Sequence, residues 1–138
     1  KLYTGDGTGK LVGNGSYMWP TGGLWNSFKH IEAADFNGDG KTDVTGIDAN
    51  NDIKYYTGDG AGKLVGNGAA MWPTGGLWAG FKWIVAGDFN NDGKADIAGI
   101  DANNDIKYYT GDGTGKLVGN GFPMWPQGGL WVGFKQLT

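Results

Sequence analysis

A segment of 53 residues recurs along the chain almost without change. The sequence Tyr-Thr-Gly-Asp-Gly begins at Tyr3, at Tyr56 and again at Tyr109, so the offset is 53 residues both times. A fixed period of this length is typical of stacked supersecondary units, as in solenoids and propellers. A residue that serves the shared function should therefore appear in every copy, and a residue found in one copy only is a poor candidate for it.

The repeat has two parts, which occur in unequal numbers. The longer part, the A unit, occurs three times, at residues 1–29, 54–82 and 107–135. The shorter part, the B unit, occurs twice, at residues 30–53 and 83–106, so that the order is A-B-A-B-A. The length of 138 residues predicts a single domain of about 2.6 periods, with a partial repeat at 1–29 and full repeats at 30–82 and 83–135.

Glycine and aromatic residues determine the expected fold class. The chain has 29 Gly and 7 Trp. Frequent glycine breaks helices and supplies turns with positive φ, whereas aromatic and β-branched residues favour strands. No window shows the apolar spacing of an amphipathic helix, so the predicted class is all-β.

The turn signals divide each period into four short antiparallel strands, which is the unit of a β-propeller blade. In the second full repeat we expect strands at residues 83–89, 96–101 and 106–110, and a fourth that opens at 116–118. About 2.6 such repeats would be closed, or completed by oligomerisation.

The charges and the missing residue types exclude several classes of function. The chain has no cysteine and no arginine, and its net charge is −3. Disulfides and thiol chemistry are therefore excluded, and no basic face for nucleic acid is visible. There is no apolar run of about 20 residues that could insert in a membrane. We expect a secreted, extracellular protein in a mature or trimmed form, since no signal peptide begins the sequence.

The strongest chemical signal is an acidic loop in each B unit, with the pattern D-x-N-x-D-G-x-x-D. Side-chain oxygens at positions 1, 3 and 5 converge when the chain wraps one ion, the glycine permits a sharp turn, and positions 7 and 9 add a carbonyl and a carboxylate. Such hard oxygen ligands suit Ca²⁺ rather than Zn²⁺. The predicted calcium ligands are Asp35, Asn37, Asp39, Lys41 (through its carbonyl) and Asp43 in the first loop, and Asp88, Asn90, Asp92, Lys94 (through its carbonyl) and Asp96 in the second.

The acidic loop has two other interpretations. An EF-hand needs Glu at position 12, where this chain has Gly46 and Gly99, and the flanking residues have the pattern of strands. The loop could also be a turn without an ion. Three carboxylates within nine residues repel one another unless a cation lies between them, which favours the calcium interpretation.

The acidic loops also carry a resemblance to a known family. The segments A-D-F-N-G-D-G-K-T-D-V (34–44) and G-D-F-N-N-D-G-K-A-D-I (87–97) resemble the FG-GAP/VCBS repeats of integrin α-subunit propellers and of secreted bacterial and fungal propeller proteins. The resemblance covers both B units closely and the A units more loosely. It implies a β-propeller with Ca²⁺ in a loop between two strands of each blade. It also implies sugar sites between neighbouring blades, because several members are lectins. Complete propellers of the family carry more blades than this chain.

Each A unit contains the segment M-W-P-x-G-G-L-W. An exposed indole can stack on the C–H face of a sugar ring while Asp and Asn bind the hydroxyls. The alternative is that tryptophan fills the space between blades, and we expect this of the second tryptophan of each pair, at Trp25, Trp78 and Trp131. The predicted sugar-binding residues are Trp19, Trp72 and Trp125, with Asp6, Asp59, Asp112, Asn14, Asn67 and Asn120.

No repeated constellation indicates catalysis. The single histidine, His30, is replaced by Trp83 in the next copy, and Gly-Asp-Gly-Thr-Gly-Lys-Leu lacks the Ser or Thr of a phosphate loop. We therefore expect no enzymatic activity. The leading hypothesis is a calcium-stabilised carbohydrate-binding protein, a lectin with repeated weak sugar sites. The alternatives are a non-catalytic protein-binding or adhesion module and an accessory domain of a larger secreted enzyme.

The sequence also predicts self-association. An A unit at 1–29 without a B unit before it should expose strand edges and aromatic surface. We therefore expect a homo-oligomer, and a symmetric dimer is favoured because it is the commonest closed assembly.

Overall fold

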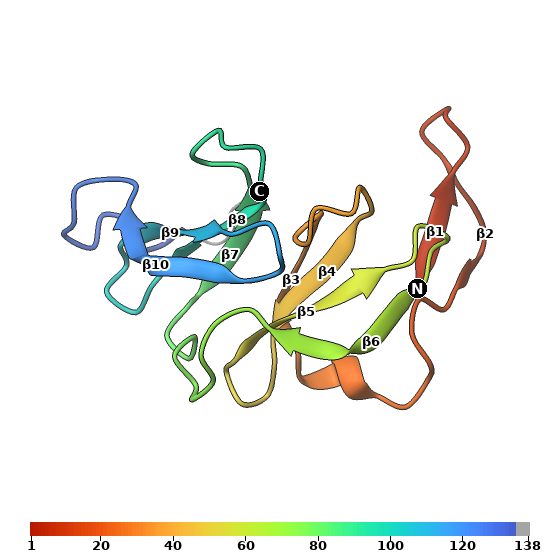
Figure 1. The fold of residues 1–138 in the computed structure, drawn as a ribbon, viewed down its shortest axis with the longest axis horizontal. Coiled ribbons are helices and arrows are strands. Elements are labelled where there is room, and N and C mark those ends of the chain that lie inside the picture. Colours follow the sequence, from red (N-terminus) through yellow and green to blue (C-terminus); the bar gives the residue numbers. More distant parts are fainter. Residues whose placement is uncertain (135–138) are drawn as a thin grey trace.

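The computed structural model describes residues 1–134, whose strands form three antiparallel sheets arranged along one axis of the molecule (Figure 1). The first sheet pairs β1 (Leu2–Gly5) with β2 (Leu11–Ser16). The second has the order β3 (Lys29–Ala34), β4 (Asp43–Ile47), β5 (Ile53–Gly58) and β6 (Leu64–Ala70). The third contains β7 (Trp83–Gly87), β8 (Asp96–Ile100), β9 (Ile106–Gly111) and β10 (Leu117–Pro123) in sequence order. A 3₁₀ turn, η1 (Leu24–Ser27), follows β2.

This architecture confirms the all-β prediction and the four-stranded, propeller-type blade. The strands expected in the second full repeat are all present, and β7 ends two residues early because Asp88 already begins the acidic loop. No sheet in the described part of the chain closes on itself. The two four-stranded sheets contact each other through β3 and β7, and the β1–β2 hairpin lies at the opposite end from β9 and β10 (Figure 1).

The tight hairpin turns are built by one aspartate in each A unit. In the β5–β6 turn, Asp59 Oδ1 accepts the backbone N–H groups of Ala61 and Lys63, at 2.7 and 2.9 Å. Gly60 and Gly62 have φ of 76° and 90°, a region that glycine adopts without strain. Asp6 and Asp112 make the same bonds in the other two hairpins.

The hydrophobic core lies between the two four-stranded blades. Its buried members are Phe36, Ile47, Ile53, Met71, Trp78, Ile84, Ile97 and Leu117. Backbone hydrogen bonds tie the blades together at this junction, because Gly115 N donates to Phe36 O and Leu117 N donates to Met71 O, both at 2.8 Å. The junction therefore combines apolar burial with backbone pairing.

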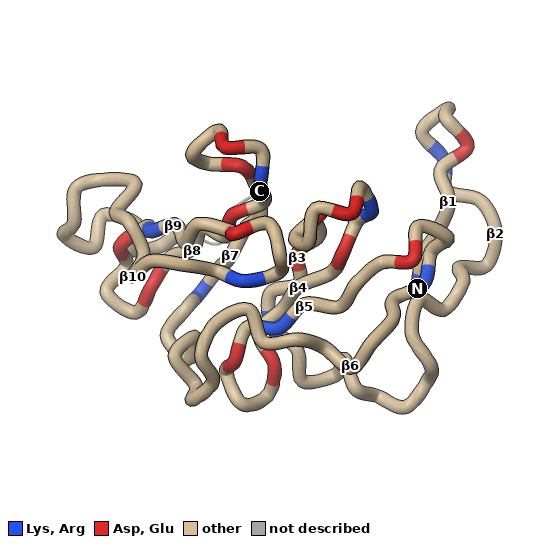
Figure 2. The backbone as a smooth tube through the Cα atoms, viewed as in Figure 1, with Lys and Arg blue, Asp and Glu red and all other residues tan. Residues whose placement is uncertain are grey.

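The acidic residues gather at two opposite edges of the blades (Figure 2). The β3–β4 and β7–β8 loops carry them at the upper edge of the view, and the β4–β5 turn carries them at the lower edge. Among residues 1–134, no helix has the length and apolar character needed to cross a membrane.

Candidate functional site

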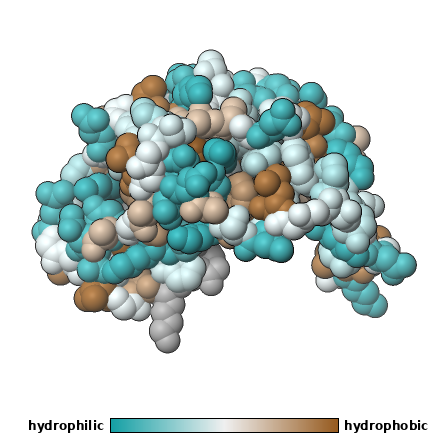
Figure 3. Space-filling model, turned by 90° about the horizontal axis from the view of Figure 1, so that it is seen from below, coloured by the Kyte–Doolittle hydropathy of each residue, from teal (hydrophilic) through white to brown (hydrophobic). Residues whose placement is uncertain are grey.

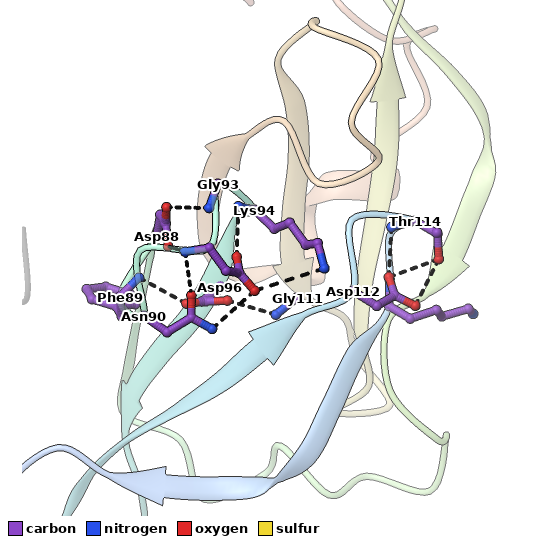
Figure 4. A network of polar contacts seen from close by, with 11 residues as sticks. Asp88, Phe89, Asn90, Gly93, Lys94, Asp96, Gly111, Asp112 and Thr114 are labelled. Carbon is purple, nitrogen blue, oxygen red and sulfur yellow. Dashed lines mark hydrogen bonds and ion pairs between the residues drawn. The ribbon is translucent and has the colours of Figure 1, made fainter.

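The two acidic loops connect the first and second strand of each blade, and their own backbone organises them. In the first loop, Asp35 accepts N–H groups through both carboxylate oxygens, from Gly38 at 2.7 Å and from Gly40 at 2.8 Å. Asn37 and Asp39 each accept an N–H two residues further along, at 3.0 and 2.9 Å. The second loop repeats the arrangement with Asp88, Asn90 and Asp92 (Figure 4). All these oxygens therefore face the inside of the loop.

The last aspartate of each loop differs from the others because it is fully buried. Asp43 is 0% exposed and accepts two N–H groups, from Phe36 at 3.1 Å and from Gly58 at 2.9 Å. Asp96 makes the same contacts with Phe89 and Gly111 (Figure 4). The buried carboxylate thus joins the acidic loop to the turn that ends the third strand of the same blade.

The donor set of the loops fits a hard cation. Burial is the main cause that raises the pKa of Asp43, and the charges of Asp39 and Asp35 raise it further, while the two N–H donors lower it. The three carboxylates are therefore close enough to repel, and a cation among them would relieve this repulsion. In residues 1–134, however, no three acidic side chains converge on one point. Binding an ion would require these side chains to turn from the loop N–H groups towards it.

The tryptophan loops follow the second strand of each A unit, which is β2, β6 or β10, and the two tryptophans of a pair differ in burial. Trp78 is only 2% exposed and belongs to the core, as expected for the second tryptophan of the pair. Trp72 is half-buried and packs edge-on against Tyr109, with ring centroids 5.3 Å apart at 76°. Trp19 packs in the same way on Tyr56, at 5.1 Å and 80°. These contacts fix each indole while leaving part of it accessible.

The third tryptophan loop lacks such a partner. Trp125 is 56% exposed and stacks on no aromatic ring among the described residues. Its equivalents Trp19 and Trp72 are held by a tyrosine of the following blade. The three copies of the segment are therefore not equivalent in space.

The structure separates the other predicted sugar-binding residues from the tryptophans. Asp59 lies in the β5–β6 turn, whereas Trp72 follows the far end of β6, and the seven strand residues between them span about 20 Å. Asp6 and Asp112 occupy the same turn in their hairpins and hold backbone N–H groups there. Asn14, Asn67 and Asn120 are exposed on the intervening strands β2, β6 and β10.

The polar residues that do lie beside the tryptophan loops come from the turn D-A-N-N-D of the B units. Asp52 is buried, and its Oδ1 accepts the N–H groups of Gly75 and Gly76 at 2.8 and 2.9 Å. Asp105 holds Gly128 and Gly129 in the same way. The sequence of this segment predicts only a turn, although its identical recurrence in both B units is a signal of a shared contact.

An ion pair stabilises the same turn. Asp48 Oδ2 lies 2.8 Å from Lys54 Nζ. Partial burial of Asp48 would raise its pKa, but the hydrogen bond from Lys54 and those from the N–H groups of Asp52 and Asn50 outweigh it, so its pKa is lowered. Asp101 and Lys107 form the equivalent pair at 2.7 Å in the next blade. An ion pair therefore holds each turn in place beside its tryptophan loop.

Comparison with known families identifies the repeat. Residues 35–99 match the model described as an FG-GAP-like repeat. This segment is an FG-GAP-like repeat. The match starts at the first aspartate of one acidic loop and extends through the whole of the next. It therefore covers both loops and the strands β4 to β7, but not β3, which ends at Ala34. None of the curated proteins compared with the chain matches it. The family match and the four-stranded sheets agree on a propeller-type repeat.

Proposed function

We propose that the chain is a non-catalytic, calcium-stabilised carbohydrate-binding module. The observation that carries this proposal is the repeated tryptophan held edge-on by a tyrosine, in Trp72 on Tyr109 and Trp19 on Tyr56. A partly exposed indole fixed by its neighbour loses little conformational entropy when a sugar ring stacks on it.

We assign the polar contacts of the sugar to the edge of the blade that carries the tryptophan loop. Thr74 and Asn50 are exposed there, and the Asn50 carbonyl lies close to Gly76 in the tryptophan loop. Hydroxyl and amide groups beside an aromatic face are the combination that pyranose rings require. Two such sites in one chain bind weakly one by one, and together they raise the affinity for a surface that presents many sugars.

A second candidate function is protein binding or adhesion, since FG-GAP repeats are also used as protein-binding modules. The Trp72 site favours the sugar over a protein partner because its accessible aromatic surface is a single ring, whereas stable protein interfaces bury about 800 Å² on each partner. An accessory role beside a secreted enzyme is compatible with either form of binding.

The experiment that tests sugar binding is a glycan array probed with the wild type and with Trp72→Ala in the presence of Ca²⁺. We expect the wild type to bind a defined set of glycans, and Trp72→Ala to lose roughly tenfold in apparent affinity, because one of two stacking platforms is removed. Leu77→Ala is the matched control, since Leu77 is exposed in the same loop but is not aromatic. Equal binding by all three proteins would place the site elsewhere, and an array without hits would contradict the proposal.

Calcium should stabilise the fold through the two acidic loops. A bound ion neutralises the clustered carboxylates, and at 100 times its dissociation constant each site would add about 2.7 kcal/mol to the free energy of unfolding. We therefore expect the melting temperature to fall with EDTA and to recover with excess Ca²⁺. Asp39→Ala combined with Asp92→Ala should remove most of this response, because each loop then lacks its ligand at position 5. A melting temperature that ignores both EDTA and Ca²⁺ would contradict calcium binding.

A further inference from the structure

The junction between the two four-stranded blades consists of two complementary faces. The β7–β10 blade contributes the acceptor face, which we define by Ile84, Ile97, Tyr109 and Leu117. The β3–β6 blade contributes the inserted face, which we define by Phe36, Met71 and Trp78. Together these faces exclude water, since Ile84 and Phe36 are each only 2% exposed.

The repeat supplies a second acceptor face, on the β3–β6 blade, whose residues lie 53 positions earlier. They are Ile31, Val44, Tyr56 and Leu64. Three of them, Ile31, Val44 and Leu64, line an open cleft of about 560 Å³ beside the β1–β2 hairpin. Ile31 is 50% exposed, whereas its equivalent Ile84 is buried. Figure 3 shows apolar residues in the recess between the body of the molecule and the arm at the right of the view, which is the end that carries the β1–β2 hairpin.

The repeat also supplies a second inserted face, on the β7–β10 blade. It consists of Phe89, Met124 and Trp131, the equivalents of Phe36, Met71 and Trp78. Phe89 and Met124 are each 38% exposed, in contrast to the buried residues of the first inserted face. The molecule therefore presents one free inserted face and one incompletely covered acceptor face, at opposite ends of its two blades.

The loop of the first A unit now covers part of that acceptor face, and it is held by fewer bonds than its equivalents. In the A unit at 54–82, Met71 N and Trp78 N donate to Ile53 O and Asn51 O of the preceding B unit. Among residues 1–134, the equivalent N–H groups of Met18 and Trp25 donate to no backbone carbonyl. The loop keeps only the bonds to the acceptor face, where Leu64 N donates to Met18 O at 2.8 Å and Lys63 Nζ donates to Tyr17 O, as the equivalent lysine and leucine do at the internal junction.

We propose that copies of this chain associate end to end. The β7–β10 blade of one copy binds the acceptor face on the β3–β6 blade of the next and displaces the A unit at 1–29. The contact reproduces the internal junction, so Phe89 becomes buried and its carbonyl accepts the N–H of Gly62, as Phe36 O accepts that of Gly115. Displacement breaks no strand pairing, because β1 and β2 pair only with each other in the described chain.

The geometry of this contact sets the form of the assembly. Two different faces meet, so the contact is heterologous and adds two blades for each copy. A ring of about 4–8 blades, the range of known propellers, would then contain roughly two to four copies. The proposal is independent of sugar binding, because Trp125 of the incoming blade would take the place of Trp19 on Tyr56.

Sedimentation velocity of the full chain, with two charge variants and a control, tests the proposal. We expect the wild type to sediment above the monomer mass of 14.6 kDa at about 100 µM. Phe89→Asp in the inserted face and Ile31→Asp in the acceptor face should each give folded monomers, because before association Phe89 is 38% and Ile31 50% exposed. Val118→Asp is the matched control, since Val118 is 44% exposed and its equivalent Val65 stays exposed at the internal junction.

Mixing the two variants separates the pairing of an inserted face with an acceptor face from a dimer in which like faces meet. Phe89→Asp keeps an intact acceptor face and Ile31→Asp keeps an intact inserted face, so an equimolar mixture should form a dimer containing one of each. A dimer in which like faces meet, if damaged by both substitutions, would not be restored by mixing, and this result would overturn the proposal. Three other results would overturn the proposal as well. The wild type could remain monomeric at about 100 µM, the two variants could still associate, or the Val118→Asp control could also dissociate.

Discussion

Trp78→Ala is expected to lower the free energy of unfolding by about 3–5 kcal/mol, the range observed when a large buried aromatic residue is truncated. The indole is buried between the blades, 4.4 Å from the Phe81 ring and 4.9 Å from the Tyr109 ring, and packs with Ile84 and Ile97 in the same core cluster. Truncation would leave a cavity that the strands on both sides cannot fill without losing their pairing. Chemical denaturation monitored by circular dichroism measures the change.

The chain contains its own control for this effect. Trp125→Ala removes an indole that is mostly exposed, so it should change the stability of the monomer far less. Because Trp125 belongs to the free end blade, the comparison is made at low micromolar concentration. Equal losses for the two substitutions would contradict the assignment of Trp78 to the core.

Asp43→Ala is expected to have a comparable effect, about 3–5 kcal/mol, because each hydrogen bond to a charged acceptor contributes about 1.5–3 kcal/mol. The substitution leaves the N–H groups of Phe36 and Gly58 without an acceptor in the interior. This loss should appear with EDTA as well as with Ca²⁺, since it arises from the protein's own bonds.

Asp39→Ala separates this structural role from ion binding. The Asp39 carboxylate bonds only to neighbours within its own loop and is partly exposed, so its removal should have little effect in EDTA while reducing the stabilisation by Ca²⁺. If Asp43→Ala were harmless in EDTA, the buried carboxylate would act only as a calcium ligand. The proposed link between loop and strand would then be wrong.

The sequence predicted the blades because two local signals agreed. The turn residues recur every 53 positions, and Asp59 with its flanking glycines can form only a tight turn, as the hydrogen bonds at that turn confirm. The apolar segments between the turns are too short to form helices. The four-stranded sheets follow from these signals with boundaries that shift by no more than two residues in the strands predicted individually.

The distances between motifs could not be predicted in the same way. Asp59 and Trp72 both recur with the period and looked like parts of one site, yet β6 separates them. Conversely, Asp52 and the Gly75-Gly76 pair lie 23 and 24 residues apart in sequence and meet in space. Periodicity shows that residues share a role, but only the path of the strands shows which of them touch.

Equivalent residues also differ because their neighbours differ. Trp72 packs on Tyr109 of the following blade, whereas Trp125 has no ring beside it among residues 1–134. The same contrast separates Phe36 from Phe89. These differences depend on what lies next to each blade, and a single repeat carries no information about its neighbour.

Calorimetric titration of a monosaccharide into the calcium-loaded chain tests the proposed function most directly. The sugar would be the one that gives the strongest signal on the glycan array. The account predicts saturable binding with one sugar for each tryptophan held on a tyrosine, which is two per chain, and about half that stoichiometry in Trp72→Ala. Saturable binding that leaves Trp72→Ala unchanged, or the absence of any binding heat, would contradict it.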